Sequence, residues 1–305
     1  MMDLDPIFEA YDHWGLGPDV GGEWGRIRHE NRSPLLEALA HHDRTLLDRV
    51  LTMPIERHGA TTKLRDHGCL ETDATEWTGL CSPCNASDIE AWSEITGQVP
   101  ERLKAPAGAL LPPDIFRHDA EAVLLMRAGL YRLIDIGGGY GGMALQFFLH
   151  GAGRPLAYTD IDLFDTLCFA YAYLERRLPG QVRFGKDATS PIRLVPSHDA
   201  PRGPQAIDAV VNYRSWGEMS PATVAHYFRL IAEWRPPVVW HENATQISPG
   251  SLPSVLQDQA DRQASYKREL LIHDYPDLPG YEVERSAPSP WKTGCRYMRV
   301  ALRAT

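Results

Sequence analysis

The sequence is poor in cysteine, with only five in 305 residues. An odd and sparse set of cysteines argues against a disulfide-stapled scaffold, which needs paired cysteines at high density. No uncharged apolar run approaches the ~18 residues of a membrane-spanning helix. The first residues are acidic and lack the basic-then-apolar pattern of a secretory signal. We therefore expect a cytoplasmic protein.

Positive charge is also scarce: 31 basic residues face 40 acidic ones, which gives a formal net charge of −9. A net acidic chain has no global attraction to nucleic acid or to an anionic membrane, so we expect neither as a partner. The 43% hydrophobic and 23% charged residues are typical of a globular protein with a large core. Internal repeats and low-complexity segments are missing from the sequence.

One group of candidate metal ligands comprises His67, Cys69, Cys81 and Cys84. Their spacing does not match a standard two-knuckle zinc site, and no thioredoxin-like βαβ pattern surrounds the Cys-x-x-Cys pair. We predict ordinary reduced cysteines and no metal site, although a zinc role is left open.

The first 112 residues are predicted to be mainly helical. A capped helix begins at Ser33 and shows apolar residues three or four apart as far as Leu51, and a second capped helix runs from Ser87 until Gly97 ends it. No alternating β-branched run is present. We expect residues 1–112 to be either a substrate-binding region or a helical cap that covers apolar surface.

From residue 113 onward, short apolar runs alternate with helical patterns. We predict helices at 114–128, 143–150, 163–178 and 221–234, and strands at 131–136, 155–159, 181–184, 207–213 and 237–240. Strands separated by helices form parallel sheets with helices on both faces. Two further strands, 281–285 and 295–303, have no helix between them and predict an antiparallel hairpin. The sequence thus predicts a second domain, residues 113–305, with a Rossmann-like α/β fold.

The string DIGGGYGG at 135–142 follows a predicted strand and opens a predicted helix, as a ligand-binding glycine loop must. Glycines let the backbone turn sharply and let a ligand approach the main chain. Gly137 to Gly142 matches the dinucleotide pattern G-x-G-x-x-G. Asp135 to Gly141 matches the pattern E/D-x-G-x-G-x-G of S-adenosylmethionine-dependent methyltransferases.

Carboxylates help to choose between the two ligands. Asp135 would repel a pyrophosphate but tolerates the cationic end of S-adenosylmethionine. Asp160 and Asp162, after the second strand, can accept ribose hydroxyls, and Asp187, after the third predicted strand, could accept from an adenine amino group. The predicted cofactor-binding residues are Asp135, Gly137, Gly139, Tyr140, Gly141, Asp160, Asp162, Asp187 and Asn212.

Several segments resemble the bacterial sugar O-methyltransferase family, part of the class I S-adenosylmethionine-dependent methyltransferases. The resemblance lies in residues 133–142, 158–163, 169–174, 208–219 and 227–228, and covers about residues 110 to 245. Asp162-Leu-Phe stands where the family tends to have Asp-Leu-Pro. The resemblance implies transfer of a methyl group from S-adenosylmethionine to a hydroxyl of a sugar or glycosylated small molecule, in bacterial secondary or glycan metabolism.

Transfer to oxygen requires alignment of the acceptor and a group that takes its proton. His241 is our first candidate base, with Glu242 beside it to orient the imidazole, and Glu218 is the second candidate. The predicted substrate-binding residues are Tyr213, Arg214, Ser215, Trp216 and Asn243. Structural roles stay open for these groups, since Glu218 could favour a helix dipole and His241 could be satisfied by backbone.

Two alternative functions stay open at this point. An NAD(P)-dependent oxidoreductase could use the same glycine loop, although the sequence has no Tyr-xxx-Lys dyad. A non-catalytic nucleotide-binding scaffold would also keep the loop. A magnesium requirement and a homodimer are neither predicted nor excluded.

Overall fold

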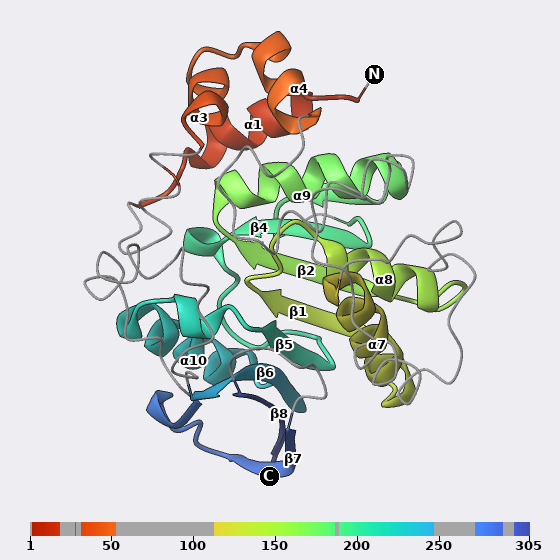
Figure 1. Ribbon diagram of the computed structural model, residues 1–305, viewed down its shortest axis with the longest axis vertical. Helices are drawn as coiled ribbons and strands as arrows, with labels where there is room; N and C mark the ends of the chain where they lie inside the picture. The colour runs from red at the N-terminus through yellow and green to blue at the C-terminus, as the bar shows by residue number, and fades with distance from the viewer. Residues whose placement is uncertain are drawn as a thin grey trace, which may run out of the picture.

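The structure is a computed structural model that describes residues 2–18, 28, 32–52, 113–186, 189–246, 272–288 and 296–305. Within these ranges, eight strands form a central sheet. They are β1 (Arg132–Ile136), β2 (Ala157–Asp162), β3 (Val182–Phe184), β4 (Ile192–Pro196), β5 (Ala209–Tyr213), β6 (Val238–Gln246), β7 (Tyr281–Pro288) and β8 (Arg296–Ala304). They pair in the order β3-β4-β2-β1-β5-β6-β8-β7 (Figure 1). Neighbours are parallel from β3 to β6, and β8 is antiparallel to both β6 and β7. The predicted sheet, mostly parallel with an antiparallel C-terminal hairpin, is confirmed.

Helices cover both faces of this sheet. They are α1 (Asp5–Trp14), α3 (Ser33–Ala40), α4 (Arg44–Thr52), α7 (Pro113–Arg127), α8 (Gly142–His150), α9 (Phe164–Arg177) and α10 (Pro221–Trp234). One core joins α7, α8 and α9 to the first face of the sheet, with α1, α3 and α4 outside α9. A second core joins α10 to the other face. The N-terminal helices and the β7–β8 hairpin lie at opposite ends of the molecule (Figure 1).

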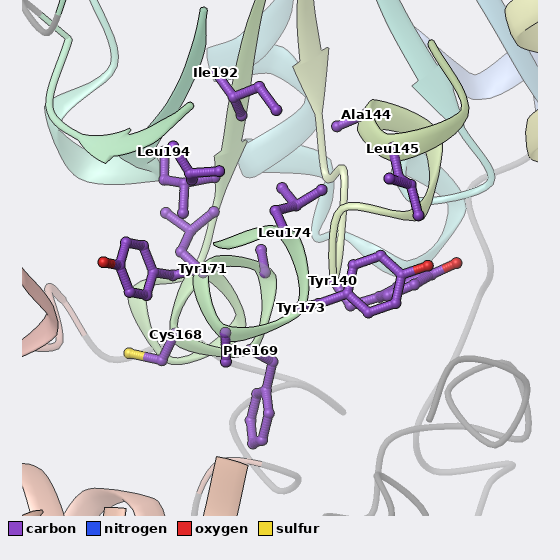
Figure 2. Packing of buried hydrophobic residues seen from close by; sticks show 14 of the residues in the cluster. Tyr140, Ala144, Leu145, Cys168, Phe169, Tyr171, Tyr173, Leu174, Ile192 and Leu194 are labelled. Carbon is purple, nitrogen blue, oxygen red and sulfur yellow. The ribbon is translucent and has the colours of Figure 1, made fainter. Parts of the chain in front are cut away.

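The first core is built largely on α9. Figure 2 shows the side chains of α9 beneath Ile192 and Leu194 of β4, with Tyr140 from the segment before α8 beside Tyr173. The fourteen-residue helix has a continuous run of buried positions from Phe164 to Leu174 because α1, α4 and the sheet all pack against it. Its first turn is therefore fixed on several sides.

Side chains along β1 alternate between the two faces of the sheet. Leu133 packs in the first core, Ile134 and Ile136 pack in the second, and Asp135 faces the same side as Leu133. The chain leaves β1 toward β2 on one side and later returns to β5 on the other. The carboxyl ends of β1 and β5 thus form the topological switch point at which open α/β sheets bind ligands.

One strand was not predicted. Residues 181–184, taken as the third strand, form the edge strand β3, and Ile192–Pro196 forms β4 between β3 and β2. The carboxyl end next to β2 is therefore that of β4, followed by the short helix η5 (Ser197–Asp199).

Part of the N-terminal prediction lies outside the described residues. This applies to the helix expected from Ser87, to the group His67, Cys69, Cys81 and Cys84, and to the domain boundary at residue 112. No group of three or more His, Cys, Asp and Glu side chains suited to a metal occurs in the described ranges. Within the same ranges, no helix has the length and apolar character needed to cross a membrane.

Candidate functional site

The glycine loop, Gly137–Gly141, joins β1 to α8 at the switch point. Gly137, Gly139 and Gly141 have φ values of 75°, 66° and 89°, which L side chains rarely adopt. A Cβ on Gly137 would collide with the side chain of Ser215, whereas a Cβ on Gly139 would have no atom of the described residues within 4 Å. The loop is closed against the end of β5 and open at Gly139, so a ligand can approach its backbone there.

Asp162, the last residue of β2, is tied to this loop. Its Oδ2 accepts a hydrogen bond from the Gly139 amide at 2.9 Å, and its Oδ1 accepts one from the Leu163 amide at 2.6 Å. Burial raises the pKa of Asp162 to about 6, while these two amides and the charge of Arg32 oppose the rise. The half-buried carboxylate stands where doubly wound folds accept ribose hydroxyls.

Two further carboxylates lie beneath the loop. Asp135 and Asp160 are register partners on β1 and β2, and both are fully buried. A Cβ on Gly138 would be 2.6 Å from Asp160 Oδ1 and 3.0 Å from Asp135 Oδ2, so only glycine fits above them. Burial raises the pKa of Asp135 to about 7, although the Tyr158 hydroxyl donates to its Oδ2 and opposes this. Burial and the neighbouring carboxylates raise the pKa of Asp160 well above its usual range.

This carboxylate cluster, Asp135, Asp160 and Asp162, fits a ligand that carries positive charge. Among the described residues, no hydrogen-bond donor reaches either oxygen of Asp160 or the Oδ1 of Asp135. The nearby Gly138 amide favours the charged form of Asp160 without meeting hydrogen-bond geometry. A pyrophosphate here would raise these pKa values further, whereas an ammonium or sulfonium group would favour the ionised carboxylates and be attracted to them. The cluster and the open backbone at Gly139 therefore fit S-adenosylmethionine better than a dinucleotide.

An amide network closes the ends of β5 and β6. Asn212 Nδ2 donates to the Ile136 carbonyl at 2.6 Å, and the Ser215 hydroxyl donates to the same carbonyl at 3.0 Å. Asn243 Nδ2 donates to Asn212 Oδ1 at 2.9 Å. Asn212, Ser215 and Asn243, predicted to bind ligands, are thus brought together with the end of β1, where they hold three strands in position.

The structure argues against His241 as the base. The side chain is only 4% exposed and packs against Trp216 and Tyr275, with ring centroids 5.0 Å and 6.1 Å away. Burial lowers its pKa to about 3, so the imidazole stays neutral and accepts a proton poorly near pH 7. Alternation along β6 turns His241 toward the α10 core, which the sequence pattern did not reveal.

Two predicted ligand-binding aromatics lie in the cores. Trp216 is fully buried against Phe228, so it cannot stack on a sugar. Tyr140 is 3% exposed, lies edge-on to Tyr173 at 4.9 Å and forms a 3.2 Å hydrogen bond with His118 of α7 (Figure 2). For Tyr140, only its backbone belongs to the loop, and its side chain fixes the loop to α7 and α9.

Arg214, the residue after β5, forms a buried ion pair with Glu242 of β6. Arg214 Nη2 lies 2.6 Å from Glu242 Oε1, and the side chains are 7% and 3% exposed. Arg214 also has a left-handed φ of 62°. Glu242 therefore pairs with the guanidinium of Arg214 instead of orienting His241. Tyr213, at the end of β5, is half-buried.

Two predicted site residues fall where the structure gives no account of them. Asp187 lies outside the described residues, between β3 and β4. Glu218 ends the short helix η6 (Trp216–Glu218), directly after β5, but its side chain lies outside the described part.

Sequence reasoning missed the N-terminal contribution to this end of the sheet. Arg28 and Arg32 both pair with Asp165 in the first turn of α9. Trp14 donates its indole N–H to Asp199 of η5 at 3.2 Å. These contacts join residues more than 130 positions apart, so no local pattern could have predicted them.

Comparison with known proteins adds similarity in structure only. No protein-family model and no curated protein matches the chain. Magnesium protoporphyrin IX methyltransferase (ChlM) from Synechocystis PCC 6803 with bound SAH is similar over 77% of this chain and 100% of its own, with 14% identity and a TM-score of 0.44. The methyltransferase domain of bacterial CtHen1 is similar over 61% and 97%, with 16% identity and a TM-score of 0.42. At such low scores, the function must be argued from the site.

Proposed function

We propose that the protein is an S-adenosylmethionine-dependent O-methyltransferase whose acceptor is a hydroxyl of a sugar or glycosylated small molecule. The carboxylate cluster beneath an open glycine loop at the β1–β5 switch point carries this proposal. Three acidic side chains favour a sulfonium nucleoside over a dinucleotide. The sequence resemblance of residues 208–219 supports the sugar acceptor.

Each part of the site has a role in this proposal. Asp162 accepts the ribose hydroxyls, and the backbone around Gly139 lies along the ligand. A positive charge bound above Asp135 and Asp160 favours the ionised forms of these two carboxyls. When bound at these residues, the cofactor would supply an electrophilic methyl carbon for transfer to the acceptor oxygen. Tyr213 is the proposed contact for the acceptor, because it is the half-buried aromatic at the end of β5.

A group of this chain must take the hydroxyl proton. Glu218 is the proposed base because it follows the end of β5 in η6 and because burial leaves His241 with too low a pKa. A positioned base contributes about 10²–10⁴ in rate. His241, Asn212 and Asn243 are assigned to holding the strand ends.

Binding measurements separate this proposal from an NAD(P)-dependent oxidoreductase. Isothermal titration calorimetry should show saturable binding of S-adenosylhomocysteine and none of NADP⁺ at the same concentrations. Binding of NADP⁺ alone would replace the proposal with the oxidoreductase.

Turnover separates the enzyme from a non-catalytic scaffold. Mass spectrometry should detect addition of one methyl group to a member of a panel of sugars and glycosides, and the Glu218→Gln variant should lose turnover while it still binds S-adenosylhomocysteine. Cofactor binding without methylation of any hydroxyl acceptor would contradict the sugar assignment.

A further inference from the structure

The N-terminal segment is anchored to α9 by a buried ion triad. Arg28 Nη2 lies 2.7 Å from Asp165 Oδ1, and Arg32 Nη1 lies 2.5 Å from Asp165 Oδ2. Arg32 also donates to the Thr166 hydroxyl at 2.8 Å. All three charged side chains are at most 4% exposed. A segment far away in sequence therefore reaches Asp165 in the first turn of α9, three residues after Asp162.

A second anchor joins the same segment to the end of β4. The Trp14 indole donates to Asp199 Oδ2 at 3.2 Å, and Lys186 Nζ lies 2.7 Å from Asp199 Oδ1. Gly17 packs so closely on η5 that a Cβ there would lie 2.7 Å from His198 Cε1. Described residues of the N-terminal part thus contact the first turn of α9, which follows β2, and η5, which follows β4.

The charge of this anchor matters for the site. A junction that only needed stability could be apolar, since replacing a buried ion network by packed hydrophobic residues is often neutral or stabilising. Here the network places Arg32 close enough for its charge to oppose the raised pKa of Asp162. The negative charges of the neighbouring carboxylates raise the pKa of Asp162 instead.

We propose that Arg32, held by Asp165, is a positioning residue for the nucleoside end of the site. Its positive charge keeps Asp162 ionised and able to accept ribose hydroxyls, which makes the N-terminal segment part of the cofactor site. This inference rests on the proposed function.

The environment of Asp162 sets the direction of the pH effect. Asp165 adds negative charge from α9, whereas Arg32 adds positive charge. Asp160 interacts with Asp162 from within β2, Asp135 does so from β1, and Tyr227 approaches it from α10. Because burial already raises its pKa to about 6, loss of Arg32 raises this pKa further. As the pH falls, Asp162 of such a variant is protonated at a higher pH than in the wild type. Ligand binding that needs the Asp162 carboxylate then weakens at that higher pH.

Calorimetry with S-adenosylhomocysteine at pH 6 and pH 8 tests the inference. The Arg32→Met variant should bind roughly tenfold more weakly at pH 6 than at pH 8, a factor that corresponds to a shift of about one pKa unit. The wild type should show a smaller ratio between its affinities at pH 8 and pH 6. The Arg32→Lys variant, which keeps the positive charge, should show the wild-type ratio. Equal loss at both pH values, or no loss, would overturn the positioning role.

Two further variants guard against a folding artefact. Arg28→Met, Arg32→Met and Asp165→Leu together remove the triad without leaving an unpaired buried charge. Because the opposing charges of Arg32 and Asp165 are both lost, the ratio between the two pH values should be smaller than that of Arg32→Met. Asp208→Asn removes a partner of Arg132 at the opposite end of β1 and should behave as the wild type. A triple variant whose ratio equals or exceeds that of Arg32→Met would refute the inference, because the effect would then follow loss of the junction and not loss of the charge of Arg32. Failure of the wild type to bind at either pH would instead refute the proposed function and with it this role.

Discussion

At the scale of single residues, a substitution at Gly139 tests whether the glycine loop contacts the ligand. Gly139→Ala should lower the affinity for S-adenosylhomocysteine at least roughly tenfold, since a lost contribution of about 1.4 kcal/mol has that effect. The reason is that the new methyl group occupies the open space beside the loop, where no atom from the described part of the chain lies within 4 Å. Calorimetry on the purified variant measures the change.

Gly153 provides a matched control. It also has a left-handed φ, 82°, and open space where a Cβ methyl group would lie, but it belongs to the turn after α8. Gly153→Ala should destabilise the protein by about 1–2 kcal/mol, as Gly139→Ala should, and leave affinity unchanged. Equal affinities for the two variants would remove Gly139 from the ligand site.

Asp160 should make the ligand-free protein less stable as pH rises. Folding raises the pKa values of Asp160 and Asp135 above the unfolded value of about 3.9, so their contribution is complete below that pH. It is lost as pH rises through the folded pKa, which is about 7 for Asp135. Asp160→Asn should therefore reduce the fall in unfolding free energy between pH 5.5 and pH 8.5 by about 1.4 kcal/mol per pKa unit removed. Urea denaturation at both pH values measures this.

Asp208 should show the opposite trend, because hydrogen bonds from Arg132 and from backbone amides hold its pKa below the ordinary value. Its stabilisation is present above the unfolded pKa and is lost as pH falls, so Asp208→Asn should alter only the acid side of the profile. An Asp160→Asn profile that overlays the wild type would show that the buried carboxylates do not titrate in this range.

Among the elements, α10 depends on a defined N-cap beside the candidate site. The Ser220 side chain accepts a hydrogen bond from the Thr223 amide at 3.1 Å. Ser220→Ala should lower the free energy of unfolding by about 1 kcal/mol, whereas Ser220→Asp should retain most of it. Chemical denaturation distinguishes the two variants, and equal losses would mean that the cap contributes nothing.

The elements also show what the sequence could predict. Alternating strands and helices after residue 113, and the final hairpin, follow from hydrophobic period alone. The strand β4 did not, because its five residues, which begin after Pro191 and end with Pro196, give too short a pattern. Its extended form depends on pairing with β2 and β3. For the site, the glycine string predicted the loop, but the burial of Trp216 and His241 depends on which face of the sheet α10 covers.

For the whole molecule, ligand binding should raise stability in proportion to occupancy. Free S-adenosylhomocysteine at a hundredfold excess over its Kd should add about 2.7 kcal/mol to the free energy of unfolding. A thermal melt followed by circular dichroism should show a higher Tm with this ligand and an unchanged Tm with NADP⁺. An increase with NADP⁺ alone would favour the dinucleotide interpretation of the loop.

The tight fit of Gly138 over Asp160 and Asp135 constrains the order in which this site can change during evolution. A methyl group at position 138 would lie 2.6 Å from an oxygen of Asp160, so alanine is accommodated there only after that carboxylate has been shortened or removed. Substitutions at 138 and 160 are therefore epistatic. Lineages that carry a larger residue at 138 should carry a smaller one at 160, a covariation that can be sought among homologous sequences.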